Sequence, residues 1–234
     1  MRPAGREEGR GVRSYYTRAL AGERLRACYE VAPARVRRYL EEEVRFVRGR
    51  LAPTDTVLEL GCGTGRVAWQ LAPPAARVVG IDVSPESLGL ATVSGGDGSR
   101  CGFVAADATA LPFPATTFAA VVCVQNGICA FHADPVTVLR EALRVTTRPG
   151  RVLLSSYTGG FWPDRLAWFR LQAAHGLVGE IDEEATRPGE IVCRDGFSVG
   201  TMSREGFLRL CHAAGVTPSI TEVDGSSVFC EVVV

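Results

Sequence analysis

Three glycines at alternate positions, Gly61, Gly63 and Gly65, follow directly on the short apolar run TVLEL at residues 56–60. Because glycine has no Cβ atom, such a segment can turn tightly and bring its backbone close to a ligand. A helix is expected to begin at about Arg66, and its first N–H groups can face the same ligand. The pattern therefore predicts a ligand-binding loop between a buried strand and a helix.

Two carboxylates follow the next apolar runs of the chain. Asp82 ends the run RVVGID at 77–82, and Asp107 ends the run CGFVAAD at 101–107. In a doubly wound α/β fold, a carboxylate at the tip of the second strand accepts hydrogen bonds from ribose hydroxyls. The alternative for each aspartate is a loop acid that caps a helix. A dinucleotide-binding loop needs a third glycine where this chain has Arg66, which argues against a nicotinamide cofactor.

The segment Glu59-Leu60-Gly61-Cys62-Gly63-Thr64-Gly65 resembles the first motif of class I S-adenosylmethionine-dependent methyltransferases, and the order of the expected elements agrees over about residues 55–234. The resemblance implies that S-adenosylmethionine is the cofactor, with its methionine part at the glycine loop, its ribose at Asp82 and its adenine amine at Asp107. The cofactor-binding residues predicted on this basis are Glu59, Gly61, Cys62, Gly63, Gly65, Asp82, Val83, Asp107, Ala108, Gln125, Asn126 and Tyr15.

The segment VQNGICAFH at 124–132 follows the fourth apolar run, and the resemblance implies that it faces the transferred methyl group. We predict His132 and Tyr16 as catalytic residues; the alternative for His132 is an ordinary loop histidine near a helix start. No [DN]PPY segment follows that run, which counts against the amide- and adenine-methylating branches. The fifth run ends at Tyr157 without a pair of acids that could hold Mg²⁺, so a metal-independent reaction is predicted.

Methyl transfer is an in-line displacement at a sulfonium carbon, for which a protein mainly supplies alignment and desolvation. A base is needed only if the nucleophile arrives protonated. The side chains expected to wall the acceptor are aromatic and come from the N-terminal helices and a later insertion, namely Tyr15, Tyr16, Tyr29, Tyr157, Phe161, Trp162, Trp168 and Phe169. For the Trp and Phe residues, the alternative is that they form only the insertion's own small core.

The elements that must position these residues follow a regular rhythm. Short apolar runs alternate with helical segments from residue 55 onward, which predicts a parallel sheet with helices on both faces. Two late runs, SITEV at 219–223 and SVFCEVVV at 227–234, are expected at an antiparallel edge. We therefore predict an α/β fold with a doubly wound, mostly parallel, seven-stranded sheet and an antiparallel last strand.

Segments on either side of the glycine loop divide the chain further. Residues 1–13 are rich in Gly and Arg and are predicted to be a disordered tail. Residues 14–50 are predicted to form an N-terminal helical lid, with one helix over about 14–30 and a second after Pro33. Residues 51–234 are expected to form the Rossmann-like core.

An insertion is expected to interrupt this core after the fifth strand, at about residues 158–202. A helix is predicted from Pro163 to about His175, and two short runs on either side of Asp195-Gly196 are predicted to pair as a hairpin. The segment would then act as a cap on the core.

Composition limits the classes of function. The formal net charge is zero, which argues against a dedicated nucleic-acid binder. All 26 basic residues are arginine, so no lysine can form a Schiff base with a substrate. Eight cysteines without a CxxC pair, together with the absence of a signal peptide or a membrane-spanning run, predict a cytoplasmic protein with reduced thiols.

The function predicted from these observations is methyl transfer from S-adenosylmethionine to a small molecule, by a monomer or homodimer. One alternative is a protein or RNA methyltransferase that uses the basic N-terminal arm, since residues 1–50 hold 13 Arg and 7 Glu. Another is a catalytically silent subunit that only binds the cofactor.

Overall fold

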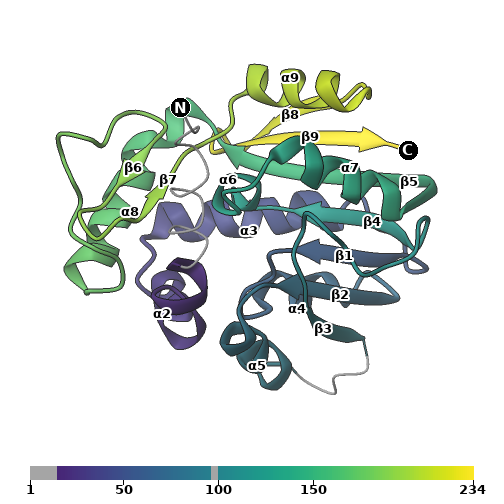
Figure 1. Cartoon of the computed structure of the whole chain (residues 1–234), viewed down its shortest axis with the longest axis horizontal. Coiled ribbons are helices and arrows are strands. Elements are labelled where there is room, and N and C mark those ends of the chain that lie inside the picture. The colour runs from purple at the N-terminus through teal and green to yellow at the C-terminus, as the bar shows by residue number, and fades with distance from the viewer. Residues whose placement is uncertain (1–14, 96–99) are drawn as a thin grey trace, which may run out of the picture.

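The computed structural model describes residues 15–95 and 100–234. Its main feature is a seven-stranded sheet in the order β3-β2-β1-β4-β5-β9-β8 (Figure 1). The strands are β1 (Thr56–Leu60), β2 (Arg77–Asp82), β3 (Cys101–Ala105), β4 (Phe118–Cys123), β5 (Thr146–Tyr157), β8 (Ser219–Val223) and β9 (Ser227–Val233). The first five run parallel, and the last strand, β9, runs antiparallel to its neighbours β5 and β8. The predicted fold class is confirmed.

The position of the last two strands refines the expected antiparallel edge. β9 lies inside the sheet, where Leu153 of β5 pairs with Glu231 and Ser219 of β8 pairs with the same residue on its other side. β8 therefore forms the edge and has the same direction as the parallel strands. The apolar composition of β9 fits its central place, because it is covered on both faces, while β8 is polar and half exposed.

Helices cover both faces of the sheet, because neighbouring apolar residues of each strand point to opposite faces and both must be buried. Leu58 and Leu60 point into a buried cluster with α7 (Pro135–Val145) and α9 (Arg204–Ala214). Val57, which directly precedes Leu58, points the other way into a cluster with α3 (Ala34–Arg48) and α4 (Arg66–Leu71). Side chains alternate across a strand, so a continuous apolar run buries both faces at once.

The helix after β2 begins as the sequence indicates. α5 (Pro85–Val93) has Ser84 as its N-cap, and the Ser84 hydroxyl accepts a hydrogen bond from the Ser87 N–H group at 3.2 Å. Proline at the first helical position supplies a suitable φ and needs no hydrogen-bond partner for nitrogen. This start fixes where β2 ends, and therefore where Asp82 lies.

The N-terminal region differs from the predicted lid over 14–50. Residues 15–18 are helical, the helix breaks over 19–21, and α2 covers Gly22–Glu30. The break has a local cause: Gly22 has a φ of 53°, and its N–H group donates to the Ser87 hydroxyl at 3.0 Å instead of continuing the first helix. The predicted tail 1–13, and Ser14 with it, lie outside the described residues.

α3 packs directly on the sheet. Its residues Val44 and Val47 are buried against the sheet in the cluster that contains Val57. The apolar face that its helical spacing predicts is therefore buried on the sheet, and only the segment before α3 remains to cover the strand ends.

The insertion forms the predicted elements at one side of the molecule (Figure 1). It contains a short 3₁₀ turn, η2 (Gly159–Phe161), then α8 (Trp162–Ala174) and a small hairpin of β6 (Ile191–Val192) and β7 (Ser198–Val199). Its buried residues do not form a core of their own, because they pack with residues of the N-terminal segment. The shared cluster consists of Tyr15, Leu20, Cys28, Phe169, Val178, Ile181, Ile191, Cys193, Phe197 and Val199.

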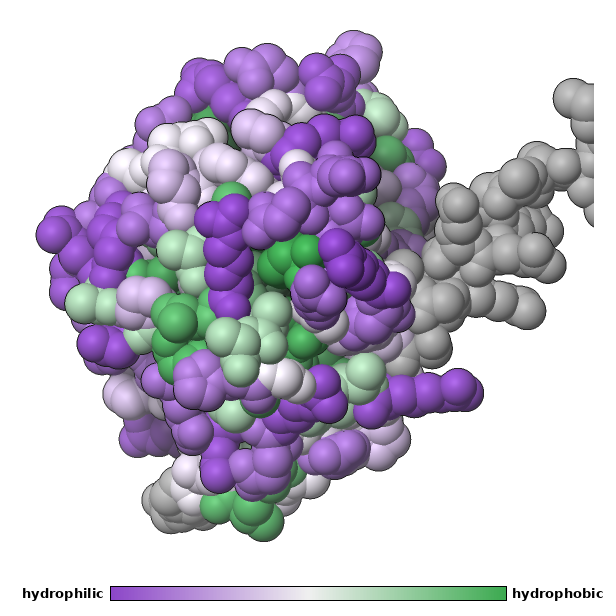
Figure 2. Space-filling view, turned by 90° about the vertical axis from the view of Figure 1, so that its left-hand side faces the viewer, coloured by the Kyte–Doolittle hydropathy of each residue, from purple (hydrophilic) through white to green (hydrophobic). Residues whose placement is uncertain are grey.

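Seen from the side of the insertion, apolar residues gather at the centre of the face and hydrophilic residues surround them (Figure 2). None of the helices in residues 15–95 and 100–234 has the length and apolar character that a bilayer span requires.

Candidate functional site

A cavity of about 450 Å³ opens where the carboxyl ends of β1, β2 and β4 meet. This is the edge at which doubly wound sheets bind their ligands, because the strand order reverses on either side of β1. The glycine loop and the ends of the strands form one wall, and the N-terminal segment and the insertion form the other. The volume lies in the range of sites for small organic molecules.

The glycine loop has the backbone that its composition predicts. Gly61 and Gly63 have φ values of 71° and 50°, a region that residues with a Cβ atom rarely adopt. A Cβ atom on Gly61 would lie 2.6 Å from the ring of Phe131, and one on Gly63 would lie 2.9 Å from Leu25. The loop is therefore closely enclosed, and any side chain larger than hydrogen would enter the cavity wall. Cys62 lies between the two glycines and lines the cavity with them.

Asp82 accepts hydrogen bonds from two backbone N–H groups, one of which belongs to the glycine loop. Its Oδ2 accepts from the Gly63 N–H at 2.9 Å, and its Oδ1 accepts from the Ser84 N–H at 2.8 Å. A carboxylate has about four acceptor sites, so both oxygens can still accept from a ligand. Asp82 lines the cavity, and burial raises the pKa of its carboxyl group, although these hydrogen bonds lower it.

Asp107 lies on the next strand end and lines the same cavity with Val83 and Ala108. Its Oδ1 accepts hydrogen bonds from Thr109, at 2.8 Å from the backbone nitrogen and 2.7 Å from the hydroxyl. Val83 is 48% exposed, which is unusual for valine, and it offers an apolar surface beside a fixed carboxylate. Such a pair suits a flat heterocycle whose edge can donate a hydrogen bond.

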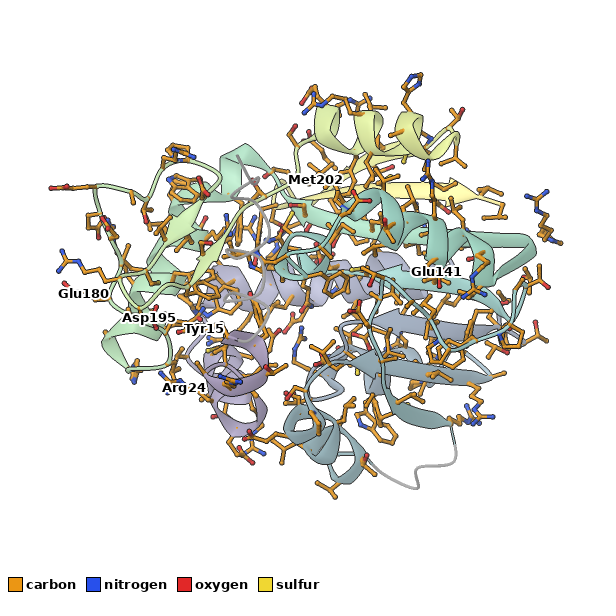
Figure 3. The ribbon with its side chains drawn as sticks, viewed as in Figure 1. Tyr15, Arg24, Glu141, Glu180, Asp195 and Met202 are labelled. Carbon is orange, nitrogen blue, oxygen red and sulfur yellow. The ribbon has the colours of Figure 1, made fainter. Side chains whose placement is uncertain are left out.

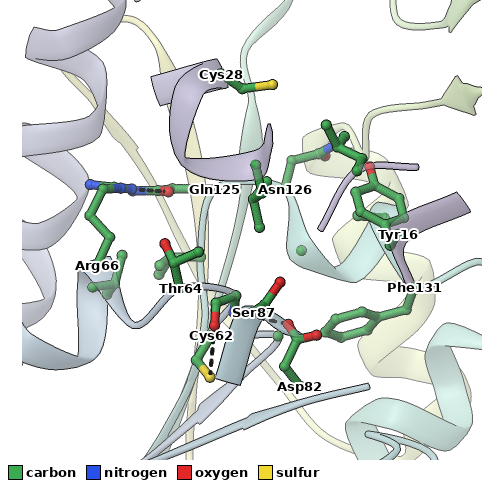
Figure 4. A pocket seen from close by; sticks show the side chains of 18 of the residues that line it. Tyr16, Cys28, Cys62, Thr64, Arg66, Asp82, Ser87, Gln125, Asn126 and Phe131 are labelled. Atoms are coloured by element: carbon green, nitrogen blue, oxygen red, sulfur yellow. Dashed lines mark hydrogen bonds between the residues drawn. The ribbon is translucent and has the colours of Figure 1, made fainter. Parts of the chain in front are cut away.

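Glu59 and Arg66 place opposite charges at the base of the loop. Glu59 is buried, and desolvation raises its pKa to about 8 while the positive charge of Arg66 lowers it. Its Oε2 has no hydrogen-bond partner among the described residues. The Arg66 guanidinium donates to the side-chain oxygen of Gln125 and lies 4.5 Å from the ring centroid of Tyr29 (Figure 4). Sequence reasoning used Arg66 only to exclude a dinucleotide loop and did not predict it as a site residue.

Gln125 and Asn126, which follow β4, both lie in the left-handed region, with φ values of 56° and 65°. The N–H group of Gln125 donates to the Glu43 carboxylate at 2.7 Å and to the Ser155 hydroxyl at 2.9 Å. The side chain of Asn126 accepts from the Ser156 hydroxyl at 2.6 Å. A backbone in this region is costly for residues other than glycine, so these contacts hold both side chains at the cavity.

Glu43 is a residue that sequence reasoning missed. It is fully buried on α3, and burial raises the pKa of its carboxyl group to about 7. A signal for it exists, because Glu43 lies on the apolar face of its helix, at helical spacing from Tyr39 and Leu40. An acid on the buried face of an amphipathic helix needs hydrogen-bond donors, which it finds here at the end of β4.

The second wall comes from the N-terminal segment and the insertion. It is largely apolar and aromatic and includes Tyr16, Leu20, Leu25, Cys28, Tyr29, Tyr157, Trp168, Phe169 and Phe197. Of the aromatic residues expected at an acceptor site, Phe161 and Trp162 are not in the lining. Both pack in the buried clusters beside it.

Tyr16, predicted as catalytic, lines the cavity (Figure 4). Burial raises the pKa of its phenol, so the hydroxyl stays protonated at neutral pH. It can therefore orient a ligand by hydrogen bonding, but it is a poor proton acceptor.

Three predicted site residues lie outside the lining of the cavity. Tyr15 points into the insertion, where its hydroxyl donates to Asp195 at 2.7 Å (Figure 3). Gly65 caps α4, and a Cβ atom there would lie 2.9 Å from Ala91 and not near a ligand. His132 follows the short helix α6 (Gly127–Ala130), and its ring centroid lies 6.5 Å from that of Tyr16. His132 therefore does not line the cavity, where a catalytic base would have to lie.

Within residues 15–95 and 100–234, no group of three or more His, Cys, Asp or Glu side chains is placed to hold a metal ion. The residues at the cavity are suited to an organic ligand with a ribose, a flat ring and opposite charges.

Comparison with known proteins agrees with this site. The family described as "Methyltransferase domain" matches residues 57–150, which contain the glycine loop, Asp82 and Asp107. The chain is 29% identical over 153 residues to a 2-methyl-6-phytyl-1,4-hydroquinone methyltransferase of Synechocystis, covering 62% of this chain and 46% of that protein. It is 38% identical over 104 residues to a demethylmenaquinone methyltransferase of Thermus thermophilus, covering 43% of this chain and 46% of that protein. The chain thus spans about half the length of these relatives.

Among solved structures, the fold is similar to magnesium protoporphyrin IX methyltransferase of Synechocystis with bound S-adenosylmethionine. The TM-score is 0.62 at 17% sequence identity, and the match covers 99% of each chain. At this identity the similarity establishes the fold alone.

Proposed function

Because this chain belongs to the class I S-adenosylmethionine-dependent methyltransferases, we propose that it transfers a methyl group from S-adenosylmethionine to a small-molecule acceptor, without a metal ion. The observation that carries the proposal is the cavity itself. One wall holds a glycine loop with Asp82 and Asp107, and the opposite wall is aromatic and belongs to segments outside the sheet.

S-adenosylmethionine is the methyl donor of this family, and the first wall has suitable partners for each of its parts. Asp82 would accept from the ribose hydroxyls, and Asp107 would accept from the adenine amine, with Val83 and Ala108 beside the ring. The methionine part would bind at the glycine loop, where the buried Oε2 of Glu59 could accept from its ammonium group and Arg66 could donate to its carboxylate. A buried carboxyl oxygen without a hydrogen-bond partner and a loop in which a Cβ atom would meet the cavity wall are the features that fit such a ligand.

The residues of this chain contribute alignment and desolvation. The donor supplies a methyl group that is already activated on a sulfonium sulfur, so the protein's part is to hold the acceptor in line with that bond and keep water out. Gln125 and Asn126, fixed by Glu43 and Ser156, lie between the two walls. The Tyr16 hydroxyl, at the lining of the cavity, is proposed to orient the acceptor by hydrogen bonding.

The relatives support an organic acceptor. One is named for a hydroquinone and the other for a demethylmenaquinone, and both are small molecules with a ring that carries oxygen. The enclosed aromatic wall of this chain suits the same size class better than a protein or RNA chain, which would need an open groove.

The N-terminal segment, residues 15–30, is proposed to act as a lid over the donor. It reaches from the insertion to α5: Arg24 donates to the carbonyl groups of Leu177 and Gly176 at 2.8 and 2.6 Å, while the Gly22 N–H donates to Ser87. The segment would therefore have to move before the donor or its product could leave.

A reducing compartment such as the cytoplasm is proposed for the protein. The eight cysteines include no CxxC pair and most of them are buried, which is typical of thiols that stay reduced.

The proposal is tested by calorimetric titration of the full chain with S-adenosylhomocysteine, S-adenosylmethionine and NADH. We expect micromolar or tighter binding of the first two and none of the third. Turnover is then measured as S-adenosylhomocysteine formation with small hydroquinones, and separately with total RNA and cell protein. Binding without turnover on any acceptor would support a silent subunit, whereas absence of S-adenosylhomocysteine binding would contradict the family's activity in this chain.

A further inference from the structure

A buried arginine lies in the wall of the cavity opposite the glycine loop. Arg165 on α8 is only 1% exposed and lines the cavity. Its Nη2 donates to the carbonyl groups of Val199 and Gly200 at 3.0 and 3.2 Å, and its Nη1 donates to that of Gly189 at 3.4 Å. These partners are neutral, so they leave the positive charge of the guanidinium without a counter-charge.

No carboxylate compensates this charge within the described residues. Arg165 forms no ion pair there, and its Nε is buried without a hydrogen-bond partner. Its neighbours are the rings of Tyr157, Phe169 and Trp162, whose centroids lie 4.8, 5.6 and 5.9 Å from Cζ. Arginine is almost never fully buried unless it is paired, because burial without a counter-charge costs its hydration. The lowered pKa of Arg165 has this burial as its main cause.

Under the proposed function, the carboxylate of the methyl donor would be held by a different arginine. Arg66 directly follows the glycine loop and lies beside Gln125 and Tyr29 on the donor's wall. Arg165 comes from the insertion and lies among the aromatic side chains of the opposite wall. The cavity is thus lined by two arginines, the half-buried Arg66 at the donor side and the buried Arg165 at the acceptor side.

We propose that the acceptor is a flat, largely apolar molecule with an anionic oxygen group, either a carboxylate or an ionised phenol or enol, which binds against Arg165. The proposal rests on the proposed function and specifies its substrate class. The rings of Tyr157 and Phe169, which line the cavity beside the guanidinium, provide the apolar surface, and the free Nε provides a donor for the anion.

An oxyanion beside Arg165 also removes the need for a base. If it is the nucleophile, the new O–CH₃ bond forms as the C–S bond breaks, the sulfur keeps the electron pair, and no proton has to leave. This agrees with the lining of the cavity, in which His132 has no place and Tyr16 is protonated. If the anion is instead a carboxylate, Arg165 anchors it while another atom of the acceptor faces the methyl group.

The test compares ligands of equal shape and different charge on the full chain saturated with S-adenosylhomocysteine. Calorimetry with 2-naphthoate and 2-naphthamide should show the anion binding at least about tenfold more tightly, as charge-assisted hydrogen bonds do. In Arg165→Met the two should bind alike. The phenolate source is tested with 4-nitrophenol, whose absorbance should show a lowered apparent pKa on binding to the natural chain and none in the variant.

Two variants serve as controls. Arg170→Met lies on the same helix, where Arg170 pairs with Glu183 in solvent, and it should keep the preference for 2-naphthoate. Arg165→Lys keeps a charge and should retain part of it. If Arg165→Met does not fold, two measurements on the natural chain still test the proposal. They are the relative affinity for 2-naphthoate and 2-naphthamide, and the change in the apparent pKa of 4-nitrophenol on binding.

Three outcomes separate the ideas. The acceptor proposal is overturned if the natural chain neither binds 2-naphthoate more tightly than 2-naphthamide nor lowers the apparent pKa of 4-nitrophenol. Failure of all three probes to bind counts as the same result. A loss of S-adenosylhomocysteine affinity in Arg165→Met as large as the loss for 2-naphthoate also overturns it, because Arg165 would then hold the donor. Failure of the natural chain to bind S-adenosylhomocysteine contradicts the proposed function itself.

Discussion

The carboxylates at the strand ends differ in which part of the site they contact. Asp82 accepts hydrogen bonds through both oxygens from backbone N–H groups, one of them in the glycine loop, whereas Asp107 accepts from Thr109 in the segment after β3. Asp82 therefore holds the glycine loop in place as well as offering acceptors to a ligand. The two residues should not contribute equally to binding of the donor.

Asp82→Ala should weaken binding of S-adenosylhomocysteine by at least about tenfold, because charge-assisted hydrogen bonds to two ribose hydroxyls are lost. Asp107→Ala should cost less, since one bond to a neutral amine is involved. Calorimetry on both variants, with thermal melting to verify that they fold, measures the order. A larger loss for Asp107→Ala would show that the two contacts are assigned the wrong way round.

Glu43 should make the stability of the fold depend on pH. Burial raises the pKa of its carboxyl group from the ordinary 4.5 to about 7, so the folded chain binds more protons than the unfolded chain between these values. Its contribution to stability is complete below about pH 4.5 and is lost as the pH rises through 7. At 1.36 kcal/mol per pKa unit, the loss is on the order of 3 kcal/mol.

Urea unfolding of the natural chain and Glu43→Gln across pH 4.5 to 7.5 measures this term. The variant keeps the shape and an acceptor for the Gln125 N–H, and it should remove most of that slope. Glu41→Gln, which is exposed on the same helix, should leave the slope unchanged. If the free energy of unfolding depends on pH in the same way for the natural chain and Glu43→Gln, Glu43 does not titrate in this range.

At the scale of elements, the N-terminal segment is tied to the insertion by few polar contacts. Tyr15 bonds to Asp195, and Arg24 bonds to the carbonyl groups that follow α8 (Figure 3). These contacts close the segment over the cavity from one side, while Gly22 joins it to α5 on the other. A lid held in this way can open without unfolding the sheet.

Removing these contacts in Tyr15→Phe/Arg24→Ala should speed dissociation of S-adenosylhomocysteine by about tenfold, because hydrogen bonds of about 0.5–1.5 kcal/mol each are lost from the closed form. Stopped-flow displacement measures the rate. Arg26→Ala is the matched control, since Arg26 is exposed and its ion-pair partners among residues 15–95 and 100–234 are Glu23 and Glu30 of its own helix. An unchanged rate in the double variant would show that the segment does not gate the cavity.

At the scale of the whole molecule, α3 packs on the sheet, so the proposed lid comprises only the residues before Pro33. α3 buries six residues, among them Val44 and Val47 against the sheet, and Arg50 at its end pairs with Glu231 of β9 at 2.8 Å. The helix therefore completes one face of the sheet. The segment before it shares its buried residues with the insertion.

A chain that begins at Pro33 should fold but bind S-adenosylhomocysteine poorly, whereas one that begins at Arg50 should lose cooperative folding. Burial of Val44 and Val47 alone contributes about 3–6 kcal/mol, a large part of the stability of an ordinary domain. Circular dichroism during heating compares the two chains with the natural one. Equal, cooperative melting of both shortened chains would place α3 outside the core.

The sequence by itself determined the sheet and the loop at its centre. Apolar runs that alternate with helices specify a parallel sheet, and glycines directly after the first run specify where its backbone turns, because both features depend on residues close together in the chain. The placement of Asp82 and Asp107 at the cavity follows from the same rule, since parallel strands end at one edge.

Only the tertiary structure decided which distant side chains meet there. Helical spacing predicts that a face is buried, but not against what, so α3 could not be distinguished from a lid and the acid on its apolar face passed unnoticed. Tyr15 and Tyr16 are neighbours in sequence, yet one bonds to the insertion and the other lines the cavity, because adjacent helical residues point in different directions. Arg165 reaches the cavity through packing between segments far apart in the chain, and no local pattern encodes that contact.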